Sequence, residues 1–512
     1  HNIHGIDIDP RAVQIAGLSL WLRAQRSWQQ QGVKPAERPT IRKSNVACAE
    51  PMPGDRAQLD AFLKTLRDER LESLIRRVLD VPAHQRVRAT PTMADALCDL
   101  VRVVWDEMKL AGEAGSLLKI EESLATAIQR ARDEWERQPL FRVETFRMTE
   151  AGEREARPKV NYTRDVPGAA ADFWAWAETL VLAALAQYAE QADGDSYARR
   201  LFAADAARGF AFIDVCRKRY DVALMNPPFG QSPAGVQRIL AGYPTGGSAN
   251  LYAAFIVRTT QLLCSSGGLG VISDSTFLKQ PTFLPLRRFL LSREAPLSLL
   301  VDLGWDVLDA NVRTAMSVVL RPADAYFGAL DVSNVSDPSD TLLLAAKTYG
   351  FAPAVYDAIL ALPKSVYAIG LSVAASRKLA EMPALGSLGS LPWGCGANDS
   401  FRLFRVRWEI APKEIHVSWA LLTNGGSFSP FYRENYLLCR SRMENGESAF
   451  TMECRNGTDT LYDASARELY YAYGLTYPKR SKLFHVAILP RGHVFTPEGK
   501  GLFLADREEI WS

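Results

Sequence analysis

Residues 221–230 read DVALMNPPFG, an apolar run that ends in an asparagine, two prolines and a phenylalanine. The apolar run predicts a buried strand, and the prolines end it because proline has a fixed φ and no backbone N–H. Asn226 therefore lies at the end of a strand, and Pro227 and Pro228 stiffen the turn that follows. The Asn226 amide oxygen and the Pro227 carbonyl are then two fixed acceptors that point one way, with Phe229 as a flat apolar face beside them.

The residues that follow alternate between helix-like and strand-like segments. Apolar residues recur at helical spacing in 250–264 and 284–292, while 268–275 and 297–304 are typical of buried strands. Residues 314–322 predict a last strand, which we expect to be antiparallel and at the sheet edge. This alternation indicates an α/β fold.

The start of the chain repeats this pattern. Residues 2–9 predict a short strand that ends in acids, and residues 10–25 predict a helix with Pro10 in its first turn, where a missing N–H does no harm. Residues 41–51 predict the next strand. Strand, helix and strand in this order indicate a parallel sheet. Because the chain opens inside a strand, we expect it to be a fragment, or the ordered part, of a longer protein.

Composition changes divide the chain further. Residues 55–215 contain four segments with helical spacing, for which Trp105, Trp174 and Trp176 are candidate core residues. From residue 385 onward, short alternating strands and many aromatic residues predict a separate α+β or β-rich domain. The predicted parts are 1–54, the first part of the α/β core; 55–215, a helical insertion; 216–322, the second part of the core; 323–384, a connector; and 385–512, the C-terminal domain.

Composition excludes several classes of protein. The 60 basic and 58 acidic residues give a net charge of +2, so any surface for a polyanion must be local. The 7 cysteines form no CxxC pair, which argues against a zinc site or disulfide scaffold and for a reducing cytoplasm. No apolar run is long enough to span a bilayer, so we expect no membrane partner.

The Asn226–Phe229 stretch suits a planar ligand that carries an exocyclic amine. An adenine N6 amine is a poor nucleophile because its lone pair is delocalised into the ring. Two oxygens that accept its hydrogens favour the pyramidal nitrogen of a transition state and stabilise positive charge that develops as a methyl group arrives. The base must first leave the duplex, and Phe229 can then stack on it. The alternative is an ordinary strand end with a Pro-Pro turn.

A second candidate site lies in GIDIDP, residues 5–10. An acid at the end of a strand in a dinucleotide-type fold can bind both hydroxyls of a ribose. Asp7 is the candidate for that contact, Ile8 for flanking an adenine ring, and Asp9 for capping the helix. Glu50, after the third strand, is either an acceptor for the adenine amine of a cofactor or an ordinary loop acid.

Five stretches resemble, in chain order, the motifs of S-adenosylmethionine-dependent N6-adenine DNA methyltransferases of the gamma class. They are GIDIDPRAVQIAGLSLWL, DVALMNPPFG, NLYAAFIVRTTQLL, GGLGVISDSTFL and VRTAMSVV. The resemblance is strongest to the large enzymes of fused restriction–modification systems and of phage-defence systems, of the BREX PglX type or the DISARM type. It covers roughly residues 1–50 and 216–322 and implies a Rossmann-like class I methyltransferase sheet.

By matching positions, the resemblance makes Asp7 the ribose-binding acid, Glu50 the contact to the cofactor adenine, and Asn226–Phe229 the catalytic loop. S-adenosylmethionine is then the cofactor, and double-stranded DNA the partner, with other defence proteins as further partners. Three departures stand out. The glycine-rich cofactor loop expected before Asp7 would precede His1, the helical insertion is long, and Val307 and Leu308 stand where an aromatic residue usually packs on the flipped base.

The C-terminal domain resembles the beginning of a target-recognition domain. Lys479, Arg480 and Lys482 form a compact basic turn next to Tyr477, which suits contact with DNA phosphates, although a solvated loop fits as well. Related chemistry also methylates RNA amines and a protein glutamine. A DNA-binding or scaffold subunit that lacks activity is a rival from another class. The sequence leaves open the recognition site, the oligomeric state and any nuclease outside this chain.

Overall fold

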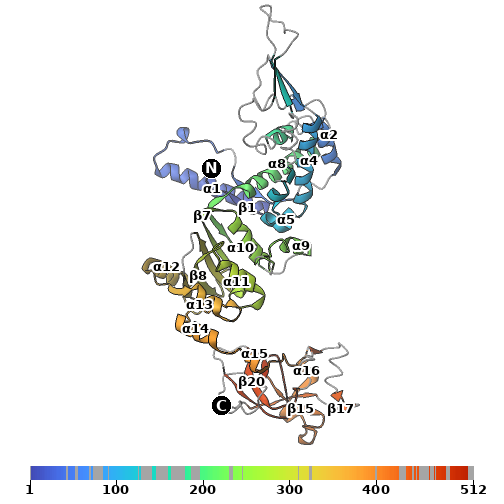
Figure 1. Cartoon of the computed structure of the whole chain (residues 1–512), viewed down its shortest axis with the longest axis vertical. Helices are drawn as coiled ribbons and strands as arrows, with labels where there is room; N and C mark the ends of the chain where they lie inside the picture. The colour runs from blue at the N-terminus through green and yellow to red at the C-terminus, as the bar shows by residue number, and fades with distance from the viewer. Residues whose placement is uncertain are drawn as a thin grey trace, which may run out of the picture. The chain divides into compact units, whose positions relative to one another are not determined.

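The computed structural model describes two compact units of the chain, His1–Ala380 and Glu381–Ser512 (Figure 1). The division lies close to the boundary predicted at residue 385. The described residues are 2–41, 44–51, 56–67, 71–72, 85–89, 91–124, 126–127, 141–145, 159–162, 179–185, 196–229, 234–244, 246–248, 250–308, 311–321, 326–397, 400–425, 434–440, 443–444, 447–448, 460–461, 466, 469–479 and 485–504.

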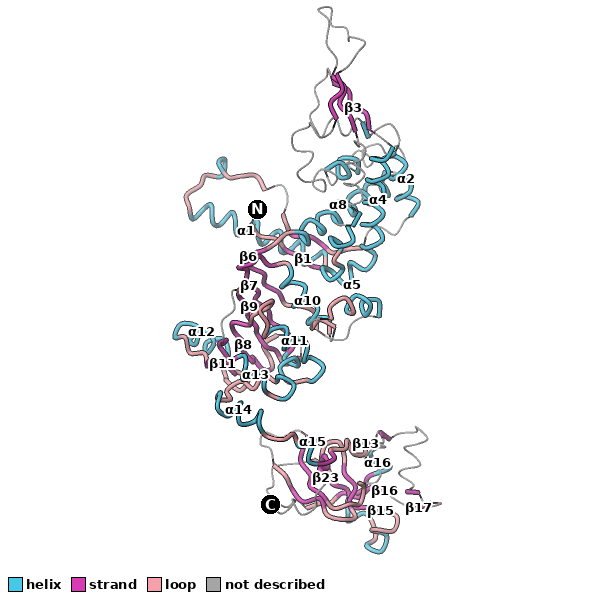
Figure 2. The backbone as a smooth tube through the Cα atoms, viewed as in Figure 1, coloured by secondary structure: helices cyan, strands magenta, loops and turns pink. Residues whose placement is uncertain are grey.

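The first unit is built on a six-stranded sheet with the order β11-β10-β8-β9-β7-β6 (Figure 2). Its strands are β6 Tyr220–Met225, β7 Leu263–Asp274, β8 Leu297–Gly304, β9 Thr314–Leu320, β10 Tyr326–Asp331 and β11 Ala352–Val355. β6 runs parallel to β7 and β10 runs parallel to β8, while β9 is antiparallel to β7 and β8. The carboxyl ends of β6, β7, β8 and β10 therefore lie at one edge of the sheet.

The structure corrects the expected position of β9. The strand is antiparallel, as predicted, but it lies between β7 and β8 instead of at the edge. Residues 323–384, predicted as a connector, add β10 and β11 to the sheet together with the helices α12 Pro338–Thr348, α13 Tyr356–Ala361 and α14 Val373–Glu381. These short elements have little hydrophobic periodicity of their own, so they are difficult to predict from the sequence.

Each face of the sheet packs on a core of its own. Leu300 of β8 belongs to a cluster with α10 Leu251–Gln261 and α11 Leu284–Leu290, whereas the adjacent Val301 belongs to a smaller cluster that includes Leu342 of α12. This alternation is the period of two that a strand buried on both faces requires. β6 is different: the sequence predicts a buried strand, but Val222 is 67% exposed and Leu224 is 82% exposed, because described residues cover only the face that carries Ala223 and Met225.

The start of the chain forms the predicted β-α-β unit. β1 Gly5–Asp7 and β2 Val46–Cys48 pair in parallel and are joined through α1 Pro10–Gln30. The Asp9 side chain accepts from the Arg11 N–H and caps α1, and Pro10 occupies its first turn, both as predicted. The rings of His4 and Tyr220 meet edge to face at 5.5 Å, so the starts of β1 and β6 are close to each other.

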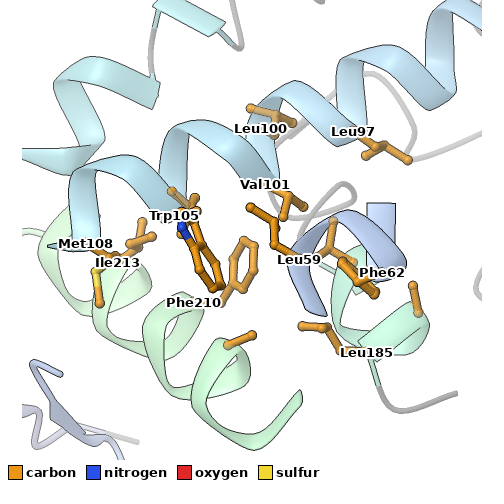
Figure 3. Close-up of a cluster of buried hydrophobic side chains, with 14 of the residues drawn as sticks. Leu59, Phe62, Leu97, Leu100, Val101, Trp105, Met108, Leu185, Phe210 and Ile213 are labelled. Atoms are coloured by element: carbon orange, nitrogen blue, oxygen red, sulfur yellow. The ribbon is translucent and has the colours of Figure 1, made fainter. Parts of the chain in front are cut away.

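The predicted insertion combines helices with a small sheet. Its main described helices are α2 Arg56–Arg67, α4 Pro91–Glu107, α5 Ala111–Ala114 and α8 Ser196–Arg217, and its antiparallel strands are β3 Gln85–Ala89, β4 Phe141–Thr145 and β5 Lys159–Tyr162. Trp105 is buried among Phe62, Phe202 and other residues of this core, as predicted (Figure 3). Trp174 and Trp176 lie outside the described residues. The same core includes Ala47 of β2, so the insertion packs directly on the first strands.

The second unit is rich in β-structure, as predicted. One four-stranded sheet has the order β12-β23-β20-β21, from Gly389–Ser390, Gly499–Leu504, Gly474–Pro478 and Ala487–Leu489. The other has the order β14-β16-β15-β22, from Phe404–Val406, Leu437–Arg440, Trp419–Thr423 and His493–Phe495. Phe495 and Phe503 contact each other in the core of this unit.

Candidate active site

Asn226 follows β6 directly at the carboxyl edge of the main sheet. Its side chain is exposed, and it has no hydrogen-bond partner among the described residues. Pro227 is buried and Phe229 is half-buried, so the turn is anchored while the amide remains accessible. The end of β6 is fixed to α10 because Thr259 Oγ1 donates to Met225 Sδ at 3.3 Å. The amide thus starts from a rigid position and is free to accept hydrogens from a ligand.

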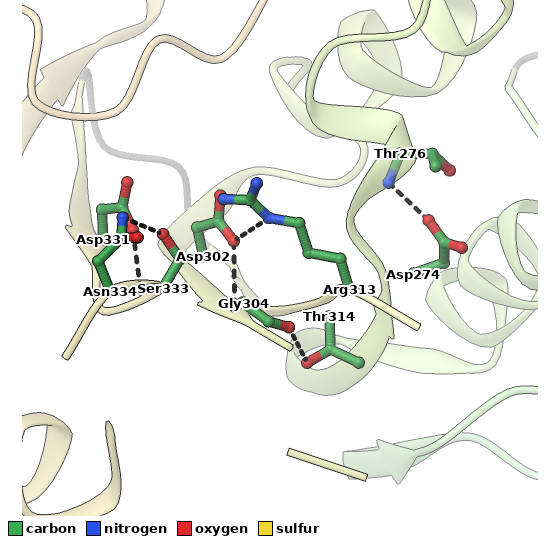
Figure 4. Close-up of polar contacts among 9 residues, drawn as sticks. All are labelled: Asp274, Thr276, Asp302, Gly304, Arg313, Thr314, Asp331, Ser333 and Asn334. Atoms are coloured by element: carbon green, nitrogen blue, oxygen red, sulfur yellow. Dashed lines mark hydrogen bonds and ion pairs between the residues drawn. The ribbon is translucent and has the colours of Figure 1, made fainter. Parts of the chain in front are cut away.

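Hydrogen bonds stabilise the turn that follows the neighbouring strand, β7. Asp274 Oδ1 accepts from the Thr276 N–H at 2.6 Å (Figure 4), and the Tyr252 hydroxyl lies 3.1 Å from Thr276 Oγ1. Tyr252 stacks on Phe283 at 5.3 Å, and burial raises the pKa of its hydroxyl well above the ordinary value. Tyr252 therefore stays protonated and holds the start of α10 against the end of β7.

The third strand end carries an aromatic residue that the sequence reasoning missed. In the strand register Gly304 of β8 lies level with Thr314 of β9, and Thr314 lies level with Asp274 of β7. Trp305 follows Gly304 and is 54% exposed, whereas Val307 is half-buried and packs on the core beneath. Trp305 precedes the expected aromatic position, so a motif search limited to that position overlooks it.

The residues predicted to bind a cofactor follow β1. Asp7 is exposed, and its Oδ1 accepts from the Asp9 N–H at 2.8 Å. This bond fixes the carboxylate while leaving acceptor capacity for a ligand. Ile8 is exposed beside it. An oriented carboxylate next to an exposed apolar side chain fits a ribose and the base attached to it, so the residues present suit a nucleoside-bearing cofactor.

Glu50 lies in a different environment. It lines a cavity of about 640 Å³ between α1, β2 and α8, and its Oε2 lies 3.3 Å from Nη1 of Arg208. Asp7 and Ile8 do not line this cavity. The nearby Cys48 is buried, and burial raises the pKa of its thiol to about 12. Glu50 thus already has a cationic partner, and Cys48 is a protonated thiol that is unsuited to nucleophilic chemistry.

A turn of the insertion lies between Ile8 and helix α10. An ideal Cβ placed on Gly115 would be 3.8 Å from Cγ2 of Ile8 and 3.9 Å from Cζ of Phe255, on α10. In the same turn, the Ser116 carbonyl accepts a hydrogen bond at 2.8 Å from Nε of Arg258. The insertion therefore packs against both Ile8 and α10. Nothing in the local sequence around Gly115 indicates this, because the contacts join residues far apart in the chain.

The predicted DNA-binding turn is described only in part. Lys479 is exposed and its Nζ lies 3.4 Å from Oε1 of Glu498, while Arg480 and Lys482 lie outside the described residues. Within the residues that the structure describes, no group of three or more His, Cys, Asp or Glu side chains could hold a metal ion. None of the described helices is long and apolar enough to cross a membrane.

The fold and site define an α/β protein whose candidate ligand-binding residues lie at the carboxyl ends of parallel strands. Residues 1–306 match the model of the Eco57I restriction-modification methylase family, which is more than half of the chain. The chain therefore belongs to this family. No sequence among the curated proteins matches it significantly.

Solved structures of restriction–modification enzymes are distantly similar. The type IIL enzyme MmeI in complex with DNA is 9% identical over 89% of this chain and 63% of its own, with a TM-score of 0.38. The DrdV–DNA complex is 12% identical over 59% of this chain and 38% of its own, with a TM-score of 0.36. The chain thus spans less than two thirds of each of these proteins. Likeness at these TM-scores carries no argument about function.

Proposed function

We propose that this protein is a DNA methyltransferase that transfers a methyl group from S-adenosylmethionine to the N6 amine of adenine. The observation that carries the proposal is the exposed amide of Asn226 at the carboxyl end of β6, which has no partner within the described part of the chain and is followed by Pro-Pro-Phe, in a chain of a methylase family. An amide oxygen held at that edge lies where α/β sheets bind their ligands.

The amide contributes by accepting a hydrogen bond. The Asn226 side-chain oxygen and the Pro227 carbonyl accept the two hydrogens of the target amine, which localises the lone pair on nitrogen. The same oxygens stabilise the positive charge that develops there during methyl transfer. Because the anchored turn already holds them in place, little reorganisation is needed at the moment of reaction.

Asp7 and Ile8 bind the cofactor in this proposal. The Asp7 carboxylate accepts from the ribose hydroxyls, and Ile8 packs on the adenine ring. When bound, the cofactor supplies an electrophilic methyl group. Glu50 is the proposed contact to the cofactor amine, and it must share its carboxylate with Arg208.

Phe229 stacks on the target base after it leaves the duplex. Trp305, exposed at the same sheet edge, is a candidate for its other face. Stacking on an aromatic side chain contributes about 1–3 kcal/mol per base. We place the activity in a restriction–modification or phage-defence system of the bacterial cytoplasm, because the family is one of restriction–modification methylases.

The test is Asn226→Ala, assayed by transfer of radiolabelled methyl groups to DNA. Methyl transfer should be lost while cofactor affinity, measured by calorimetry, stays unchanged. The matched control is Asn334→Ala, which removes an exposed asparagine that follows β10 at the same edge.

Wild-type transfer by Asn226→Ala contradicts the assignment. Activity on RNA or on a glutamine-containing peptide but not on DNA identifies a different substrate. A wild-type protein that binds DNA without any transfer is a non-catalytic subunit.

A further inference from the structure

Three side chains from distant parts of the sequence meet on the surface of the second unit. Nζ of Lys479 lies 4.9 Å from the centroid of the Trp393 ring, and Nζ of Lys500 lies 4.4 Å from the same centroid. Lys479 follows β20, Lys500 belongs to β23, and Trp393 follows β12, so three strands of one sheet hold the group. Trp393 is 49% exposed. We name these three residues the Trp393 patch.

The patch is locally basic in a unit that is neutral as a whole. Residues 381–512 contain 15 basic and 15 acidic residues, but the stretch from Lys479 to Lys500 contains five basic residues and one acidic residue, Glu498. Glu498 pairs with Lys479 at 3.4 Å, with both side chains partly exposed, so that pair is weak and screened by salt. Within the described residues, Lys500 forms no ion pair, and its ammonium lies over the indole.

The indole orders the two lysines before any partner arrives. Two ammonium groups near one ring repel each other, and the ring face partly offsets this repulsion. A lysine that is already held over a ring loses less rotamer freedom when it binds an anion, so binding is less costly. The exposed part of the indole adds an apolar surface between two positive charges. Such an arrangement matches a sugar–phosphate backbone, in which anionic and apolar groups alternate.

We propose that the Trp393 patch binds the backbone of double-stranded DNA, with Lys479 and Lys500 on phosphates and Trp393 against the intervening deoxyribose. This inference rests on the proposed function and adds to it two contact residues, Trp393 and Lys500, that lie far from the basic turn in the sequence. Phosphate contacts position a protein on DNA without reading its sequence. The patch therefore supplies affinity and orientation, and other residues of the unit read bases.

The test measures binding of the full chain to a fluorescently labelled duplex by anisotropy over a series of salt concentrations. Each neutralised phosphate contributes a slope of about −0.9 to log K against log salt. The double variant Lys479→Gln/Lys500→Gln should therefore have a slope that is less steep by about 2, on specific and non-specific duplexes alike. Trp393→Ala should lower affinity about fivefold at every salt concentration with a nearly unchanged slope, since its contact is apolar.

Arg491→Gln is the matched control. Arg491 is exposed and carries the same charge, but it lies near the first residue of β20, because Leu489 of β21 pairs with Gly474. Lys479 follows the last residue of that strand. Its removal should leave the slope unchanged, whereas Lys500→Gln alone should reduce it by about 1. Circular dichroism of each variant checks folding, and Trp393→Phe, which keeps a ring, should retain most of the affinity.

The outcomes separate this inference from the proposed function. If the double lysine variant keeps the wild-type slope, the patch does not bind DNA, and its partner is of another class, such as an acidic protein surface. If the wild-type protein does not bind duplex DNA at all, the proposed function fails first. Wild-type DNA binding with a reduced slope in the lysine variants and an unchanged slope in Arg491→Gln supports the patch.

Discussion

Asp302 holds Arg313 across the base of the loop that joins β8 to β9 (Figure 4). Nη2 of Arg313 lies 2.8 Å from Oδ2 of Asp302, and Nε lies 3.3 Å from Oδ1. Oδ1 also accepts from the Gly304 N–H at 3.2 Å. Gly304 has a φ of +80°, and a Cβ there would lie 2.7 Å from Cα of Ser333, so only glycine fits. These bonds fix the point from which Trp305 leaves the sheet.

Asp302→Asn should lower the free energy of unfolding by about 1–3 kcal/mol, because it removes the charge-assisted bonds from a buried position. Urea denaturation measures this change. Asp331→Asn is the control: Asp331 is the register partner of Asp302 on β10, but it is exposed and accepts from the Ser333 N–H. Equal losses in the two variants would mean that the Arg313 pair does not stabilise the loop.

Asp7 and Asp9 should have separable effects although they are two residues apart. Asp9→Ala removes the cap of α1 and should lower stability, with little effect on cofactor affinity. Asp7→Ala should weaken binding of S-adenosylmethionine and leave stability nearly unchanged, because its side chain is exposed. Calorimetry and thermal denaturation of both variants give the comparison. Unchanged cofactor affinity in Asp7→Ala would remove Asp7 from the site.

The elements around the site could be predicted because their signals are local. The β1-α1-β2 unit, the strand that ends at Met225 and the segment from α10 to β9 all follow from apolar spacing and from capping or proline residues. The position of Asn226 at a strand end follows from the same local pattern. Placing β9 between β7 and β8 was beyond that reasoning, since strand order depends on pairing between distant residues.

The missed site residues share this cause. Gly115 lies near Ile8, and Trp393 lies between Lys479 and Lys500, only after the chain has folded. The apolar run from Asp221 to Met225 predicts a buried strand, yet Val222 and Leu224 are exposed. Apolar composition favours burial but does not indicate which neighbouring element covers each face.

The buried ion pair between Arg258 and Glu121 should couple the insertion to α10. Arg258 is 2% exposed, its Nη2 contacts Glu121 Oε1, and its Nε donates to the Ser116 carbonyl. Arg258→Met leaves the Glu121 carboxylate without its partner and should cost about 3–5 kcal/mol. Adding Glu121→Met should recover part of that loss. A double-mutant cycle in urea tests the pair, and strictly additive losses would show that the two side chains do not interact energetically.

His493 should make stability depend on pH. Burial, with the nearby His416 as a further cause, lowers the pKa of His493 to about 4 from the ordinary value of 6.5. A lowered pKa means that the folded state disfavours protonation. The contribution of His493 to the free energy of unfolding is therefore complete above pH 6.5 and is lost as the pH falls from 6.5 to 4. Below pH 4 it does not change further. The shift corresponds to about 3 kcal/mol.

The measurement is the free energy of unfolding of the wild-type chain and of His493→Gln at several values between pH 7 and pH 4. Glutamine keeps hydrogen-bonding groups near Thr423, whose Oγ1 lies 3.0 Å from Nδ1 of His493. The wild-type chain should lose about 3 kcal/mol more than the variant over this range. Parallel curves would show that another group is responsible for the pH dependence.

Sequence choice should reside in the second unit, and exchange of that unit should test it. In the proposed function the main sheet binds a single flipped base, whereas direct readout needs side chains that enter a groove. A chimaera joined between Ala380 and Glu381, where the two compact units divide, should methylate the sequence of the donor of its second unit. Sequencing of methylated DNA identifies the site. The lysine variants of the Trp393 patch are the control, since loss of phosphate contacts should weaken methylation without changing its sequence. A chimaera that keeps its original site would place recognition in the first unit, where the insertion at 55–215 is the next candidate.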